Sequence, residues 1–207
     1  MLAADFGNMA TEVKNIEKWG ADIVHADVMD GVYVPNITFG MPMIKAFRQN
    51  STLPIDAHLM ITKPEKYVGK FCDAGADIVT FHPDASDDVQ GALDIIKSKG
   101  KKCGLVVNAD VDFDVVKPYL GQIDMLVIMT VQAGFGGQSF MPLCLAKAKL
   151  GATEREKHGY KYLIEVDGGV SEKNIALLKE AGVDIAVAGS SVFKSDNPQK
   201  IIESLHI

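Results

Sequence analysis

The sequence predicts an α/β fold, a (β/α)8 TIM barrel, formed by one domain that spans residues 1–207. Val- and Ile-rich runs of strand length recur along the chain, with segments of helical periodicity between them. Gly-Ala-Asp-Ile-Val occurs at 20–24 and 75–79, and the variant Gly-Val-Asp-Ile-Ala occurs at 182–186. In each copy the Gly suits the left-handed end of a helix, and the apolar residues after it begin a strand.

The apolar runs predict seven strands. In chain order these are 22–28, 54–60, 77–82, 102–107, 123–129, 162–167 and 184–188. The helical segments are 9–19, 64–74, 88–99, 141–157, 172–181 and 198–205, and the segments after 30 and after 106 are left unassigned. A closed barrel needs an eighth strand, and only residues 1–4 are available for it. Strand 1 is therefore expected to be truncated, because strands usually span about five or six residues.

Composition and charge exclude several functions. The chain has 21 Lys and Arg against 27 Asp and Glu, a net charge of −6, and no basic run that could follow a nucleic acid backbone. It has no signal peptide and no apolar run of membrane-spanning length. Its three cysteines, Cys72, Cys103 and Cys144, are widely spaced, as expected in a reducing compartment. We therefore expect a cytoplasmic protein that binds neither nucleic acid nor membranes.

Four residues that can bind a metal lie at the ends of predicted strands: His25, Asp27, His58 and Asp167. Barrel enzymes carry their chemistry at the carboxyl ends of the strands. His25 and Asp27 are two residues apart, so they share one face of a strand and one cation can bind both. Two imidazoles and two carboxylates suit Zn²⁺, Fe²⁺, Mn²⁺ or Co²⁺. Ordinary turn and cap residues are the alternative interpretation of each residue taken alone.

Glycine or serine turns follow three of the predicted strands, and each comes before a helix. They are Gly134-Phe135-Gly136-Gly137-Gln138, Gly168-Gly169 and Gly189-Ser190-Ser191. Together they match the usual phosphate site of a barrel, where backbone N–H groups bind the anion. Tight turns and helix caps are the alternative for any one of them.

Several motifs, in the right order and at the right separations, resemble those of the ribulose-phosphate 3-epimerase family. They are His-Ala-Asp-Val-Met-Asp-Gly at 25–31, Val-Pro-Asn-Ile-Thr-Phe-Gly at 34–40, Asp-Ala-His-Leu-Met at 56–60, Met-Thr-Val at 129–131, Gly-Phe-Gly-Gly-Gln at 134–138 and Val-Asp-Gly-Gly at 166–169. The resemblance covers nearly the whole chain.

The resemblance implies an isomerase of the pentose phosphate pathway that inverts carbon 3 of a ketopentose phosphate. It implies one divalent metal, zinc first and iron, manganese or cobalt otherwise, held by His25, Asp27, His58 and Asp167. Asp27 and Asp167 would be the two acid/base carboxylates. Substrate contacts are implied for His58, Met29, Met60, Met129, Gly134, Phe135, Gly136, Gly137, Asp167, Gly168, Gly169, Gly189 and Ser190.

This set of residues suits the chemistry. Inversion beside a ketone removes a weakly acidic proton from one face of carbon 3 and delivers a proton to the other face, which two opposed carboxylates can do. A metal stabilises the enediolate formed between the two steps. The methionine side chains would line the site with a polarizable surface that hydrates poorly. For each Met taken alone, core packing is the alternative interpretation.

The sequence departs from the family pattern at several positions. The family usually has Pro-Ser-Ile before Leu2, so the Ser, a substrate contact, has no counterpart here. Ala133 replaces a Pro, which should loosen the 134–138 loop. His82 is expected to support another residue rather than bind the metal, and Asp30 is expected to be a turn acceptor.

Other functions remain open at this point. One alternative is a 3-epimerase of a hexulose 6-phosphate, such as allulose 6-phosphate. Family members associated with that substrate tend to alter the Gly-Phe-Gly-Gly loop and the second Gly of Asp-Gly-Gly, and this alternative is less favoured because Gly134–Gly137 and Gly169 are intact. A decarboxylase of the orotidine type is disfavoured because Asp27-Val28-Met29-Asp30 has no Lys between its acids. A non-catalytic sugar-phosphate binder is the third alternative. The sequence does not decide between a monomer and a homo-oligomer, a dimer or a hexamer.

Overall fold

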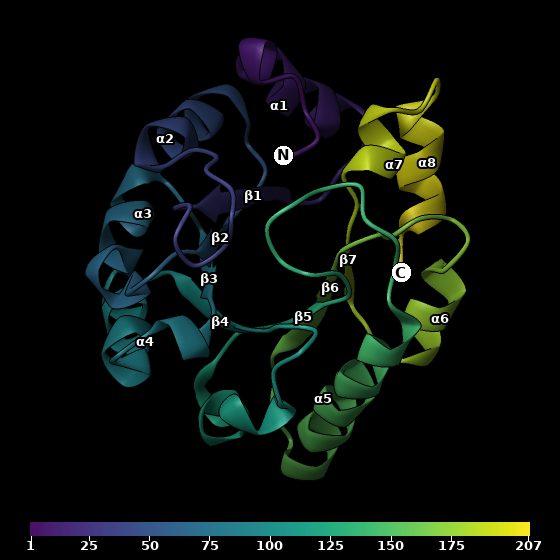
Figure 1. Ribbon diagram of the computed structural model, residues 1–207. Coiled ribbons are helices and arrows are strands. Elements are labelled where there is room, and N and C mark those ends of the chain that lie inside the picture. Colours follow the sequence, from purple (N-terminus) through teal and green to yellow (C-terminus); the bar gives the residue numbers. More distant parts are fainter. The chain divides into compact units, whose positions relative to one another are not determined.

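The computed structural model describes residues 1–207, which form two compact units, Met1–Cys103 and Gly104–Ile207 (Figure 1). In both units parallel strands alternate with helices along the chain. Strand residues of both units, such as Val24 and Leu126, are fully buried.

In the first unit, three strands pair in parallel in chain order: β1 (Val24–Met29), β2 (Ile55–Met60) and β3 (Ile78–Phe81). The helices α2 and α3 pack on β2 and β3, on one side of these strands in Figure 1. The helices of this unit are α1 (Met9–Lys18), α2 (Met41–Asn50), α3 (Val68–Ala74) and α4 (Val89–Ser98).

The register between β1 and β2 determines which side chains lie side by side. Asp27 is the Cα partner of His58, and Met29 is the partner of Met60. Because alternate residues of a strand share a face, His25, Asp27 and Met29 lie on the same face as their partners. Every residue of β1 and β2 is buried, so the polar groups on this face are shielded from solvent.

In the second unit, four strands pair in parallel in chain order. They are β4 (Lys102–Val107, which begins in the first unit), β5 (Met125–Met129), β6 (Leu163–Asp167) and β7 (Ile185–Val187). Its helices are α5 (Leu145–His158), α6 (Ile175–Glu180), α7 (Ser190–Phe193) and α8 (Pro198–Leu205).

The packing of α5 on β5 and β6 depends on a close approach at Gly151. A Cβ at this position would lie 2.6 Å from Leu126 Cδ2, so a larger residue would force the buried Leu126 side chain to move. The Tyr162 hydroxyl donates to the Gly151 carbonyl at 2.6 Å, and burial raises the pKa of Tyr162 to about 12. Arg155 on α5 pairs with Asp184, whose carboxylate also accepts from Ile164 N. These contacts hold α5 against the strands.

All seven predicted strands are confirmed within a few residues of their expected bounds. Gly20, Gly75 and Gly182 have φ values of 93°, 114° and 78°, which confirms the left-handed helix ends expected of them. The predicted strand at 1–4 is not formed. These residues make a turn that the Ala4 N to Met1 O hydrogen bond closes at 3.1 Å.

The helices agree less closely with expectation. The segment left unassigned after 30 contains α2, and the segment after 106 contains only the short 3-10 helices Phe113–Val115 and Lys117–Gln122. The helix predicted at 141–157 begins as α helix at Leu145, and the helix predicted at 172–181 is shortened to α6. None of the helices combines the length and the apolar character required to cross a bilayer.

Candidate active site

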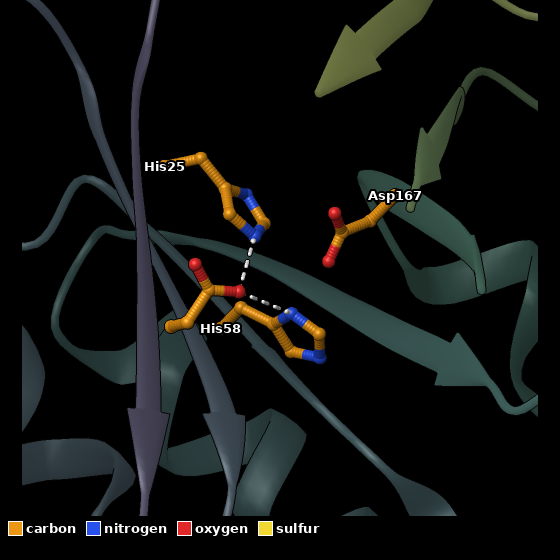
Figure 2. A group of neighbouring side chains, drawn as sticks. His25, His58 and Asp167 are labelled. Atoms are coloured by element: carbon orange, nitrogen blue, oxygen red, sulfur yellow. Dashed lines mark ion pairs between the residues drawn. The ribbon is translucent and has the colours of Figure 1, made fainter. Parts of the chain in front are cut away.

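In the first unit, two imidazoles converge on one carboxylate oxygen. His25 Nε2 lies 3.4 Å and His58 Nδ1 lies 3.8 Å from Asp27 Oδ1 (Figure 2). These separations are long for hydrogen bonds, which have N···O distances near about 2.9 Å. Two donor atoms that bind a tetrahedral ion at about 2.1 Å each lie about 3.4 Å apart. The spacing and the chemistry of this set therefore fit a divalent transition metal.

A buried carboxylate orients the first imidazole. His25 Nδ1 lies 2.8 Å from Asp56 Oδ2, and Asp56 also accepts from Thr80 Oγ1 at 3.2 Å. With the Nδ1 proton donated to Asp56, the lone pair of His25 Nε2 faces Asp27, as in the carboxylate–histidine pairs of metal sites. Asp56, which is fully buried, was not singled out from the sequence. The feature that would have identified Asp56 is the β-sheet register, which makes it the Cα partner of His25.

A second histidine contacts the other imidazole. His58 Nε2 lies 2.9 Å from His82 Nε2, and the two rings stack with centroids 5.1 Å apart. Burial, followed by the neighbouring His58, keeps the pKa of His82 well below its ordinary value, so His82 is neutral. His82 thus supports a neighbouring residue, in agreement with the expectation from the sequence.

Asp27 is ionised. Burial alone would raise the pKa of this carboxyl, but positive charge on the adjacent imidazoles of His25 and His58 outweighs burial and holds the pKa well below its usual range. A cation bound between the two neutral rings would supply that positive charge in place of their protons. Thr38 holds the backbone at this point, because its hydroxyl donates to the Asp27 carbonyl at 2.6 Å and accepts from Met29 N at 3.0 Å. A buried anion beside two imidazole nitrogens is a site suited to a cation.

In the second unit, Asp167 ends β6 and is half-buried. Thr130, at the end of the neighbouring β5, holds the backbone here. Its N–H donates to the Asp167 carbonyl at 2.8 Å, and its hydroxyl donates to the Gly168 carbonyl at 2.6 Å. Thr130 is fully buried. The sequence placed it in the Met-Thr-Val motif at 129–131 but predicted no function for it.

The three glycine or serine turns gather within the second unit. A Cβ on Gly169 would lie 2.6 Å from Phe140 N, so the turn after β6 touches the segment that follows the 134–138 loop. A Cβ on Gly137 would lie 3.5 Å from Ser190 Oγ, so the loop also reaches the turn after β7. Asn174, a buried residue missed from the sequence, donates to the Gly169 carbonyl at 2.9 Å. These turns form one glycine-rich corner.

The 134–138 loop closes on itself. Gln138 Nε2 donates to the Gln132 carbonyl at 2.6 Å and to the Phe135 carbonyl at 2.8 Å, which ties the two ends of the loop together. The Phe135 residue is 54% exposed. An exposed aromatic ring on a glycine-rich loop is suited to covering a ligand.

The predicted methionines are buried at strand ends. Met29 and Met60 are register partners in the first unit, and Met129 is the register partner of Asp167 in the second. All three are at most 4% exposed. Met29 lies two residues beyond Asp27, Met60 lies two residues beyond His58, and Met129 lies beside Asp167. The three methionines therefore give the polar strand ends apolar neighbours.

The parallel α/β order and the polar strand ends define the class of protein, an α/β-barrel enzyme. Solved structures agree on the fold. The chain is similar to a crystal structure of KGPDC from Streptococcus mutans with a TM-score of 0.76 at 16% identity, covering 99% of this chain and 92% of that one. It is similar to 3-keto-L-gulonate-6-phosphate decarboxylase from Vibrio cholerae with a TM-score of 0.72 at 14% identity, covering 95% and 90%. The predicted fold class is confirmed.

The chain belongs to the ribulose-phosphate 3-epimerase family, and it is an enzyme, a carbohydrate isomerase. The family's sequence pattern, described as "Ribulose-phosphate 3 epimerase family", matches residues 1–193. Ribulose-phosphate 3-epimerase of Bacillus subtilis is 41% identical over 206 residues, which cover 99% of this chain and 95% of the relative. The enzyme of Escherichia coli K12 is 40% identical, with 99% and 92% covered. The resemblance recognised in the motifs is confirmed.

Proposed function

We propose that this epimerase interconverts D-ribulose 5-phosphate and D-xylulose 5-phosphate, in the pentose phosphate pathway, by metal-dependent transfer of two protons at carbon 3. The observation that carries the proposal is the convergence of His25 and His58 on Asp27 in a buried site. Membership of the family supports the reaction, and the relatives carry its name.

We assign one divalent metal to His25 Nε2, His58 Nδ1 and the carboxylates of Asp27 and Asp167. The Asp56 and His82 contacts support the first two assignments, because they occupy the other nitrogen of each ring. Zinc fits a site of two imidazoles and two carboxylates, and iron, manganese or cobalt would also fit. When bound, the ion supplies Lewis-acid stabilisation of negative charge on the substrate oxygens.

Asp27 and Asp167 are the proposed catalytic residues. In each direction one carboxylate removes the proton from carbon 3, and the other, protonated, delivers a proton to the opposite face. The two residues exchange these roles when the reaction reverses.

The remaining groups would bind and enclose the sugar phosphate. Met29, Met60 and Met129 would keep water from the reacting carbon, because their side chains are apolar and buried. The backbone N–H groups of the glycine-rich corner would bind the phosphate. The contributing residues are Gly134, Phe135, Gly136, Gly137, Gly168, Gly169, Gly189 and Ser190.

The packing at Gly169 favours a pentulose over a hexulose phosphate. Any side chain here would collide with the Phe140 backbone, and φ of +66° also requires Gly. The packing of this turn therefore requires Gly169, the residue whose presence favoured a pentulose substrate in the sequence.

A coupled assay tests the proposal. The purified enzyme loaded with Zn²⁺ is given D-ribulose 5-phosphate or allulose 6-phosphate, and product formation is followed for each. We expect kcat/KM for the pentulose to exceed that for the hexulose by at least about tenfold, the discrimination available from one extra carbon in a closed pocket. A higher kcat/KM for the hexulose phosphate would reject the pentulose phosphate as the substrate. If neither sugar phosphate is turned over, a non-catalytic binder is favoured.

A further inference from the structure

The contact between His58 and His82 requires a particular placement of protons. Two ring nitrogens 2.9 Å apart share one proton, because two N–H groups would repel and two lone pairs would form no bond. Which ring donates rests on the proposed function, in which His58 binds the metal through Nδ1. The His58 proton then lies on Nε2 and is donated to His82 Nε2, so His82 acts as an acceptor.

The position of His82 is determined by its surroundings. The side chain is fully buried, and its ring contacts both the His58 ring, with centroids 5.1 Å apart, and the Tyr33 ring, with centroids 4.9 Å apart. The Tyr33 hydroxyl donates to Asp84 Oδ2 at 3.0 Å, two residues beyond His82. The Ala85 N–H donates to the His82 carbonyl at 3.1 Å. His82 therefore has little freedom to turn away from His58.

Tyr33 belongs to the segment 30–39, and hydrogen bonds to the Asp30 side chain hold the first end of this segment in place. Asp30 Oδ1 accepts from the backbone N–H groups of Val32 at 2.8 Å and Tyr33 at 2.9 Å, and Oδ2 accepts from Thr62 N at 2.8 Å. Thr62 follows β2, so one carboxylate joins the ends of β1 and β2. This agrees with the expectation that Asp30 is a turn acceptor, and the turn in addition holds Tyr33 over His82.

His82 is not explained by stability alone. Its other nitrogen, Nδ1, is buried and has no hydrogen-bond partner, which is costly for a polar atom. An apolar side chain would avoid that cost if the position only filled space. A function for Nε2 accounts for the histidine.

We propose that His82 is a positioning residue that selects the His58 tautomer with its lone pair on Nδ1, and that Tyr33 holds His82 in place. In the other tautomer, the His58 proton would point toward Asp27 and compete with the metal. Groups outside the ligands of a metal site typically change metal affinity by about 10-fold to 100-fold when they are removed. The proposal thus concerns metal affinity, which can be measured without turnover.

The test measures the dissociation constant of Co²⁺ for the metal-free protein, from its visible absorption in competition with a chelator. His82→Leu removes the acceptor and is expected to weaken Co²⁺ binding by about 10-fold to 100-fold. His82→Gln keeps an acceptor oxygen and is expected to retain most of the affinity. Tyr33→Ala should weaken binding more than Tyr33→Phe, which keeps the ring over His82. The control is His158→Leu on the partly exposed end of α5.

Unchanged Co²⁺ affinity in a folded His82→Leu protein would overturn the inference. Should that variant not fold, the ¹⁵N chemical shifts of His58 in the metal-free wild type decide: a proton on Nε2 supports the inference and a proton on Nδ1 overturns it. His58→Ala separates this proposal from the proposed function. Loss of Co²⁺ binding in His58→Ala, with normal binding in His82→Leu, rejects only the role of His82. Normal binding in His58→Ala rejects the metal site itself.

Discussion

Asp167→Asn is expected to lower the rate of inversion at carbon 3 by about 10²-fold to 10⁴-fold, the usual contribution of a general acid or base. The amide has the shape of the carboxylate but cannot relay a proton. The fold should survive, because Thr130 holds the Asp167 backbone and not its side chain. Asp27→Asn is expected to have the same effect on inversion.

The two variants should differ in a way that only two opposed bases can produce. In D₂O, the carboxylate that remains can still remove the proton from carbon 3 of one epimer and return deuterium to the same face. We therefore expect Asp167→Asn to label one of the two sugar phosphates and Asp27→Asn to label the other, as measured by mass spectrometry without net inversion.

Two controls keep this result interpretable. Asp196→Asn changes an exposed carboxylate of the same unit and should leave inversion unchanged. The metal content of each variant must be measured as well, because both aspartates are also proposed ligands. Near-normal inversion by metal-loaded Asp167→Asn would remove Asp167 from the mechanism.

Chelation is expected to abolish the interconversion of the two pentulose phosphates, and Zn²⁺ or Mn²⁺ should restore it. A bound ion would supply Lewis-acid stabilisation of the negative charge that develops on the substrate, and no cationic side chain is proposed to replace it. Mg²⁺ and Ca²⁺ should restore little activity, because both prefer oxygen ligands and this site has two imidazoles. Circular dichroism should be unchanged, because the strands are held by backbone pairing and by buried apolar residues.

Two outcomes of this experiment would contradict the metal assignment. Full activity in protein whose metal content has been reduced to background would reject metal dependence, whatever the structure of the site. Restoration by Mg²⁺ as effective as by Zn²⁺ would mean that the imidazoles are not ligands.

The strands were predictable from the sequence because each is an apolar run that follows a turn residue. Gly20, Gly75 and Gly182 were predictable for a local reason, since a helix end needs positive φ. α2 was missed because its first residue follows Gly40, which has no side chain to cap the helix. The four-residue α7 is too short to show a period.

The candidate site could be predicted only in part. His25, Asp27 and His58 form a recognisable set at strand ends, and the structure brings these three together. Asp56, Thr130 and Asn174 look like ordinary strand or turn residues, and their contacts depend on register and loop packing that no local pattern reveals. That the chain is one sugar-phosphate-binding domain and that it is cytoplasmic stay predictions.

The central claim is that a single ion joins His25, Asp27, His58 and Asp167. Anomalous diffraction from crystals of the zinc-loaded enzyme, recorded on both sides of the zinc absorption edge, tests it most directly. We expect one strong anomalous peak about 2.0–2.2 Å from His25 Nε2, His58 Nδ1 and an oxygen of each aspartate. A peak bound elsewhere, or one that lacks Asp167 among its ligands, would show that these four residues do not share one ion.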